Sequence, residues 1–117
     1  MTKTILLVDD DAHILETAED ILEAAGYVVQ TSETGKMALE KLRASPSQLM
    51  IVDLNLVDTT GLELAVQAKA IRPDLIVILM TGEASVDLGP AAPAIHSILT
   101  KPVDPGALID LIRKVLI

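Results

Sequence analysis

Acidic residues follow two apolar segments of the chain, each of which has the composition of a buried β-strand. Three aspartates, residues 9–11, come directly after the apolar run 5–8, and Asp53 ends the apolar run 49–53. If both runs are parallel strands, their carboxyl ends lie at one edge of a sheet and bring these carboxylates together. Because like charges at short range repel one another, such a cluster favours a bound cation among them.

A hydroxyl and an ammonium group stand at equivalent positions in two further segments. Thr81 ends the apolar run 75–81, and Lys101 comes directly after residues 98–100. A hydroxyl donates a hydrogen bond to an anionic oxygen, and a lysine supplies a compact positive charge. Carboxylates, a hydroxyl and an ammonium at one sheet edge therefore predict a site for a divalent metal and a phosphoryl group.

Length and composition narrow the classes of function. The chain has 117 residues, half of them hydrophobic, so we expect one domain, residues 1–117, with an ample core. The absence of cysteine excludes disulfides, thiolate metal sites and a cysteine nucleophile. A net charge of −8 argues against direct nucleic-acid binding, which needs clustered Lys and Arg, and the one aromatic residue, Tyr27, provides no stacking platform.

Nothing in the sequence indicates contact with a membrane. No apolar run approaches the ~20 residues that span a bilayer. The first residues, 1–3, lack the pattern of a signal peptide. We therefore expect a cytoplasmic protein.

Strand-like and helix-like segments alternate along the chain. We expect strands at residues 4–8, 27–31, 49–53, 75–81 and 97–100, and helices at residues 12–25, 34–44, 61–71 and 105–116. Gly26 should end the first helix, and Asp11 and Asp104 should cap the first and last helices. This alternation implies a parallel sheet with helices on both faces, whose ligands lie outside the carboxyl ends of the strands.

Two segments depart from this regular pattern. Pro90 and Pro93 prevent a long helix between the last two strands, so we expect a turn or two near residues 85–88 and then irregular chain. The last helix instead carries more apolar residues than one buried stripe requires. This excess suggests that a partner, a second copy of the chain or an attached domain covers its outer face. The residues concerned are Leu108, Ile109, Leu111, Ile112, Val115 and Leu116.

Five short motifs stand at the expected strand ends and at the start of the third helix. They are Leu7-Val8-Asp9-Asp10-Asp11, Val52-Asp53-Leu54-Asn55, Gly61-Leu62-Glu63, Met80-Thr81-Gly82 and Thr100-Lys101-Pro102. In this order, across essentially the whole chain, they resemble the CheY-like receiver domain of bacterial two-component response regulators. The resemblance implies a flavodoxin-like, doubly wound α/β fold with a five-stranded parallel sheet in the order 2-1-3-4-5. Helices would cover both faces, and in this chain the fourth helix would be short or irregular.

The resemblance assigns roles to the acidic residues. Asp53 would be the phospho-acceptor, which takes a phosphoryl group from a sensor histidine kinase or a phosphotransfer protein. Mg²⁺ would be bound by Asp10, Asp53 and the backbone carbonyl of Asn55, with Asp9 acting mainly through a bound water. The module would be a switch rather than an enzyme, since its only reactions would be self-catalysed phosphotransfer and dephosphorylation.

The resemblance also assigns roles at the neighbouring strand ends. The Thr81 hydroxyl and the Lys101 ammonium would contact phosphoryl oxygens, and Gly82 would leave room for the phosphoryl group. The peptide bond between Lys101 and Pro102 would be cis, as it usually is in the family. Glu83, together with the side chain two residues after the acceptor, would tune hydrolysis, and polar residues at both places favour a short-lived phosphorylated state.

The chain departs from the family at three places. Val57 stands where the family often has proline, which suggests a looser loop. Ile98 replaces the family's switch aromatic, so the usual rotation of a Tyr or Phe cannot occur. The fourth helix is eroded by Gly and Pro, and the resemblance therefore implies a non-standard output face.

Other functions remain as alternatives. The departures at Ile98 and the fourth helix favour a receiver-like interaction or dimerisation module that phosphorylation no longer controls. A haloacid-dehalogenase-type phosphatase would need a second acid at Asn55 and a longer chain. A flavodoxin-like flavin binder would need a phosphate-binding loop and an aromatic ring. The cognate kinase, the stimulus and the downstream output stay open.

Overall fold

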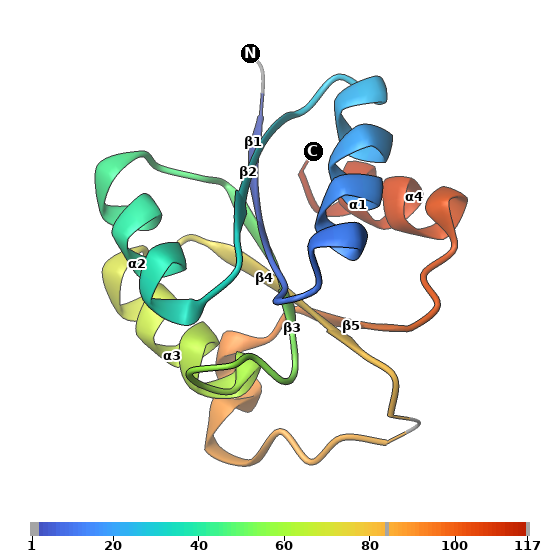
Figure 1. Ribbon diagram of the computed structural model, residues 1–117. Coiled ribbons are helices and arrows are strands. Elements are labelled where there is room, and N and C mark those ends of the chain that lie inside the picture. The colour runs from blue at the N-terminus through green and yellow to red at the C-terminus, as the bar shows by residue number, and fades with distance from the viewer. Residues whose placement is uncertain (1–2, 84, 117) are drawn as a thin grey trace.

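The computed structural model describes residues 3–83 and 85–116, and within them it shows a parallel sheet flanked by helices (Figure 1). The strands are β1 (Thr4–Val8), β2 (Val28–Ser32), β3 (Leu49–Asp53), β4 (Ile76–Thr81) and β5 (Ser97–Thr100). The α-helices are α1 (Ala12–Ala24), α2 (Gly35–Ala44), α3 (Gly61–Ile71) and α4 (Pro105–Val115), and a 3₁₀-helix, η1, covers Gly89–Ala94. The strand order is β2-β1-β3-β4-β5 with every pair parallel, which confirms the predicted fold class.

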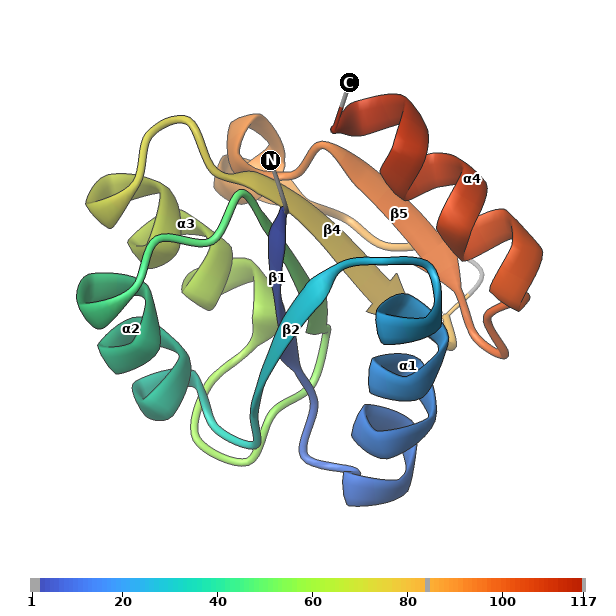
Figure 2. The ribbon, with the colours of Figure 1, turned by 90° about the horizontal axis from the view of Figure 1, so that it is seen from above.

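The sheet is covered on both faces. Successive side chains of β1 point to opposite sides. Ile5 and Leu7 therefore pack with α1 and α4, whereas Leu6 and Val8 pack with α2 and α3. Figure 2 shows these two helix layers on either side of the sheet. Burial on both faces explains why the central strands are continuous apolar runs rather than alternating ones.

The helix ends follow local capping rules. The Asp11 carboxylate accepts hydrogen bonds from the backbone N–H groups of His13 and Ile14 at 3.0 and 3.3 Å, and Asp104 caps α4 in the same way. Gly26 has a φ of +99°, as expected for glycine after a helix. Thr34, which we expected inside the second helix, is its N-cap instead. In the described part of the chain, every helix is too short or too polar to cross a membrane.

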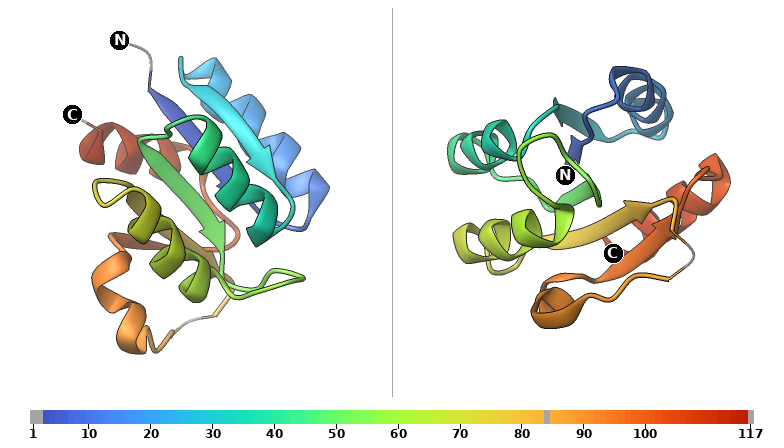
Figure 3. Two further views of the ribbon diagram at one scale, coloured as in Figure 1. Left: turned by 90° about the vertical axis from the view of Figure 1, so that its left-hand side faces the viewer. Right: turned by 60° about the horizontal axis from the view of Figure 1, so that its bottom comes forward.

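The segment before β5 differs from the sequence-based expectation. The predicted turn at residues 85–88 is wrong, because the helical turns lie at Gly89–Ala94 and include both prolines. The N–H groups of Ala91 and Ile95 donate to the carbonyls of Leu88 and Ala92, and neither bond needs a proline N–H. Figure 3 shows this short helix beside α3, against which it packs. The prediction of a short or irregular fourth helix is confirmed.

The apolar excess of α4 is partly explained by packing within the chain. Leu108 and Ile112 are buried, and the other four apolar side chains are partly buried against the same core. By contrast, Ile98 on the edge strand β5 is 42% exposed. The exposed apolar surface near this edge therefore lies on β5 rather than on α4.

Candidate functional site

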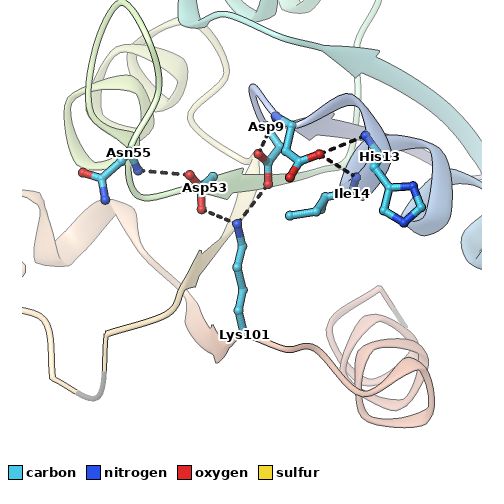
Figure 4. Close-up of polar contacts among 7 residues, drawn as sticks. Asp9, His13, Ile14, Asp53, Asn55 and Lys101 are labelled. Carbon is cyan, nitrogen blue, oxygen red and sulfur yellow. Dashed lines mark hydrogen bonds and ion pairs between the residues drawn. The ribbon is translucent and has the colours of Figure 1, made fainter.

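The predicted site residues meet at the carboxyl edge of the sheet. Asp9 follows β1, Asp53 ends β3, Thr81 ends β4 and Lys101 follows β5. The parallel register aligns Val8 with Val52 in neighbouring strands, so the residues after them lie close together. Figure 4 shows the Lys101 side chain reaching from β5 towards the carboxylates of Asp9 and Asp53.

Three carboxylates form a compact acidic cluster. One oxygen each from Asp9, Asp10 and Asp53 lies within 4.8 Å of the others. Asp9 is 1% exposed, whereas its neighbour Asp10 is exposed to solvent. Asp11 lies outside this cluster, because its carboxylate caps α1. The predicted set of acids is therefore brought together, and the third aspartate of the triplet serves the helix.

Lys101 balances part of this negative charge. Its ammonium lies 2.7 Å from Asp53 Oδ1 and 3.1 Å from Asp9 Oδ2. Burial disfavours the ammonium, but the carboxylates of Asp53 and Asp9 outweigh that effect and raise the pKa of Lys101. The Lys101 N–H donates to the carbonyl of Thr81 at 2.8 Å, and the bond to Pro102 is cis as predicted.

Asp9 is held in an environment that disfavours its charge. Burial raises the pKa of Asp9, although the backbone N–H of Asp11 and the ammonium of Lys101 act in the opposite direction. The Asp11 N–H donates to Asp9 Oδ1 at 3.0 Å. The nearby charge of Asp53 raises the pKa of Asp9 further. A cation among these groups would relieve both the desolvation and the repulsion.

Thr81 presents its hydroxyl at the same edge. The side chain is 2% exposed, and its Oγ1 accepts a hydrogen bond from the Glu83 N–H at 3.0 Å. The hydroxyl hydrogen remains a donor for an anionic oxygen. A Cβ built at Gly82 would meet no atom within 4 Å, so open space lies beside the threonine.

The loop after β3 approaches the site closely. The Asn55 N–H donates to Asp53 Oδ2 at 3.3 Å, and the Gly61 N–H donates to the carbonyl of Leu54 at 2.7 Å. A Cβ at Gly61 would collide with the backbone carbonyl oxygen of Asp53, so only glycine permits this approach of α3 to the strand end. Val57 is 75% exposed, so most of its side chain lies in solvent rather than packed against the loop.

Asp58 is a site-related residue that the sequence did not reveal. Its carboxylate accepts hydrogen bonds from the backbone N–H groups of Gly35 and Lys36, at the start of α2. These hydrogen bonds hold the pKa of Asp58 below its ordinary value. Because the partners are more than twenty residues apart, no local sequence signal indicates the contact.

The donor set suits a hard divalent cation. Carboxylate and carbonyl oxygens are the ligands that Mg²⁺ prefers, whereas zinc and copper favour nitrogen and sulfur. The three clustered carboxylates supply oxygen ligands, and Thr81 and Lys101 can contact the oxygens of a bound anion. The arrangement can therefore hold a metal and a phosphoryl group side by side.

Comparison with known proteins points to one family. Residues 5–113 match the model of the response regulator receiver domain. The chain is 38% identical over 117 residues to the response regulator receiver protein CpdR of Brucella abortus, and the match covers 98% of both proteins. It is 35% identical over 114 residues to the transcriptional regulatory protein GlrR of Escherichia coli K12, where it covers 96% of this chain but 26% of that protein.

A solved structure supports the same conclusion. The CheY-like response regulator receiver domain protein of Methanospirillum hungatei JF-1 superposes with a TM-score of 0.93 at 34% identity. The match covers 99% of this chain and 94% of that one. The five motifs, the strand order and the acidic edge agree with this likeness. The chain therefore belongs to the response regulator receiver domain family.

Proposed function

We propose that residues 1–117 form one phospho-receiver domain, in which Asp53 accepts a phosphoryl group in a Mg²⁺-dependent reaction. The observation that carries the proposal is the position of Lys101, whose ammonium lies 2.7 Å from Asp53 Oδ1 at the edge that also holds Asp9 and Thr81. The Asp53 carboxylate thus shares the sheet edge with an ammonium group, a hydroxyl and further carboxylates. Charge neutralisation and positioning are what phosphoryl transfer requires of a protein.

The reaction is a displacement at phosphorus. An oxygen of Asp53 attacks the phosphorus of a phosphohistidine on the donor, the nitrogen–phosphorus bond breaks, and the imidazole leaves with the bonding pair. Lys101 and Thr81 hold two of the phosphoryl oxygens as negative charge builds on them. Mg²⁺, when held at this edge, would supply positive charge that offsets the negative charge of the carboxylates and of the phosphoryl oxygens. Asp10, Asp53 and the Asn55 carbonyl would hold it directly, and Asp9 through a water.

The phosphorylated state ends when water attacks the acyl phosphate. The side chains of Asn55 and Glu83 are exposed beside the site and could orient that water. Gly82 leaves the approach open. These features support a short-lived phosphorylated state, with hydrolysis as the one reaction that returns the switch to its resting form.

The phosphodonor has an apolar surface beside the site on which to dock. A groove of about 500 Å³ runs between α1 and the start of α4 and is lined mainly by apolar side chains, including Ile14, Ile21 and Val103. Lys101 lines the same groove, so it is continuous with the acceptor carboxylate. We propose that a histidine kinase or phosphotransfer protein packs here and brings its phosphohistidine to Asp53.

The test is intact-mass spectrometry after incubation with acetyl phosphate and Mg²⁺. The chain contains no tryptophan, so mass is a more direct readout than fluorescence. We expect a single phosphoryl addition to the wild type, none with Asp53→Asn, and none in the wild type with EDTA. Circular dichroism should show that the variant is folded. Phosphorylation that persists in Asp53→Asn would refute the assignment of the acceptor.

A second function is favoured by one observation on the output face. Ile98 is 42% exposed on β5, next to the shortened η1, where a partner, a second copy or an attached output domain could pack. In this alternative the chain is an interaction module that phosphorylation does not control. A folded wild type that takes no phosphoryl group in the presence of Mg²⁺ would support it.

A further inference from the structure

The loop between β3 and α3 is attached to a different helix. Asp58, near its outer end, accepts hydrogen bonds from the N–H groups of Gly35 at 2.9 Å and Lys36 at 3.1 Å. The next N–H of α2, that of Met37, is bonded to the hydroxyl of the cap Thr34 at 3.1 Å. The carboxylate of Asp58 thus completes the hydrogen bonding at the start of α2, where negative charge is also favoured by the helix dipole.

The contact is also a close packing contact. A Cβ built at Gly35 would lie 2.5 Å from the methyl carbon of Thr59 and 3.5 Å from Asp58 Oδ1. A Cβ at position 35 would therefore force the Thr59 side chain to move from its present place against α2. Asp58 and Gly35 together form what we call the α2 clasp.

Hydrogen bonds within the loop connect Asn55 to the residues that contact α2. The Leu56 N–H donates to the carbonyl of Thr59 at 3.1 Å, and Asn55 pairs with Thr60 in an isolated antiparallel bridge. The position of Asn55 is therefore tied to the residues that contact α2. The exposed Val57, unlike a proline, adds no stiffness of its own to the loop.

We propose that Asp58 is a positioning residue for the metal site, because the α2 clasp restricts the loop that carries the Asn55 carbonyl before the ion arrives. The inference rests on the proposed function, which makes that carbonyl a ligand. Asp58 does not itself bind the metal. Because Asp58 already restricts the loop, less conformational entropy is lost when the metal binds. Substitution of residues that orient metal ligands typically lowers metal affinity by roughly 10–100-fold.

Two variants break the α2 clasp in different ways. Asp58→Asn removes the charge and one acceptor oxygen, while Gly35→Ala leaves Asp58 intact and displaces Thr59. We expect both to weaken Mg²⁺ binding roughly tenfold in calorimetric titrations of the unphosphorylated full chain. In the metal-free proteins, amide exchange of residues 55–60 should accelerate in both variants.

Thr34→Ala is the matched control. It removes the hydroxyl that caps α2 but leaves the hydrogen bonds of Asp58 in place, so it should lower the melting temperature while Mg²⁺ affinity stays within about twofold. Equal loss of affinity in Thr34→Ala would show that the effect is general destabilisation of α2 and would overturn the inference. Unchanged Mg²⁺ binding in both clasp variants, with normal binding by the wild type, would also overturn it while leaving the proposed function intact. A wild type that binds no Mg²⁺ would refute both.

Discussion

Replacing Asp9 with asparagine removes one charge from the acidic cluster and nearly keeps the shape of the side chain. Asp9 is 1% exposed, and burial raises its pKa. A raised pKa means that the ionised carboxylate is less stable in the folded protein than in the unfolded chain. Ionised Asp9 therefore lowers the free energy of unfolding at neutral pH, and Asp9→Asn should stabilise the metal-free protein.

The size of the effect follows from competing contributions at this position. Asparagine forfeits an ion pair with Lys101 at 3.1 Å, but Lys101 keeps its contact with Asp53 at 2.7 Å. Burying a polar group costs roughly 1–3 kcal/mol, and the loss of this pair offsets part of the relief, so we expect a gain on the order of 1 kcal/mol. An unfolding entropy of about 2.1 cal/mol/K per residue, over 117 residues, converts this gain to a rise in melting temperature of about 4 °C.

The difference in stability between Asp9→Asn and the wild type should depend on pH, whereas a difference caused by packing alone would not. Between the unfolded pKa of Asp9, near 3.8, and its higher folded value, the native state binds more protons than the unfolded chain. The stability of the wild type relative to Asp9→Asn therefore falls as the pH rises through this window. The advantage of the variant should be complete at pH 7 and shrink as the pH approaches 4.

The assay is urea denaturation with EDTA and with Mg²⁺, at several pH values between 7 and 4. Mg²⁺ at ten times its dissociation constant should stabilise the wild type by about 1.4 kcal/mol, and Asp9→Asn by less. Asp10→Asn is the matched control, since this exposed carboxylate lies in the same cluster: its loss should reduce the Mg²⁺ effect with little change in metal-free stability. Destabilisation of metal-free Asp9→Asn, or a difference that persists unchanged at pH 4, would refute the reasoning.

Three further predictions concern the site and its surroundings. Lys101→Met removes the cation from the carboxylates of Asp9 and Asp53, so metal-free stability should fall by roughly 1–3 kcal/mol in thermal melts, and phosphorylation by acetyl phosphate should slow; an unchanged melting temperature would show that the ion pairs contribute nothing. Gly61→Ala forces a Cβ against the Asp53 backbone and should cost roughly 1–3 kcal/mol, whereas Gly82→Ala, which meets open space, should melt like the wild type. Amide exchange over residues 89–95 should be faster than in α3, because a short 3₁₀-helix has poorer hydrogen-bond geometry than an α-helix, and strong protection there would contradict this.

The sequence by itself determined the fold class and most of the candidate site. Each strand is an apolar run long enough to be buried on both faces, and each site residue stands directly at or after the end of such a run. Because parallel strands present their carboxyl ends at one edge, the order along the chain was enough to predict that Asp9, Asp53, Thr81 and Lys101 meet. The helix caps were predictable for the same reason, since they depend on neighbours within a few residues.

The tertiary structure decided what depends on contacts between distant segments. Asp9 and Asp10 are adjacent in the sequence and both contribute to the acidic cluster, yet Asp9 is buried beside Lys101 and Asp10 is exposed to solvent. The position of η1 depended on its packing against α3, which local proline rules do not describe. The bonds from Asp58 to the start of α2 join segments more than twenty residues apart. Local pattern specifies which groups end each strand, but only the packed fold specifies which of them are buried, paired or held in place.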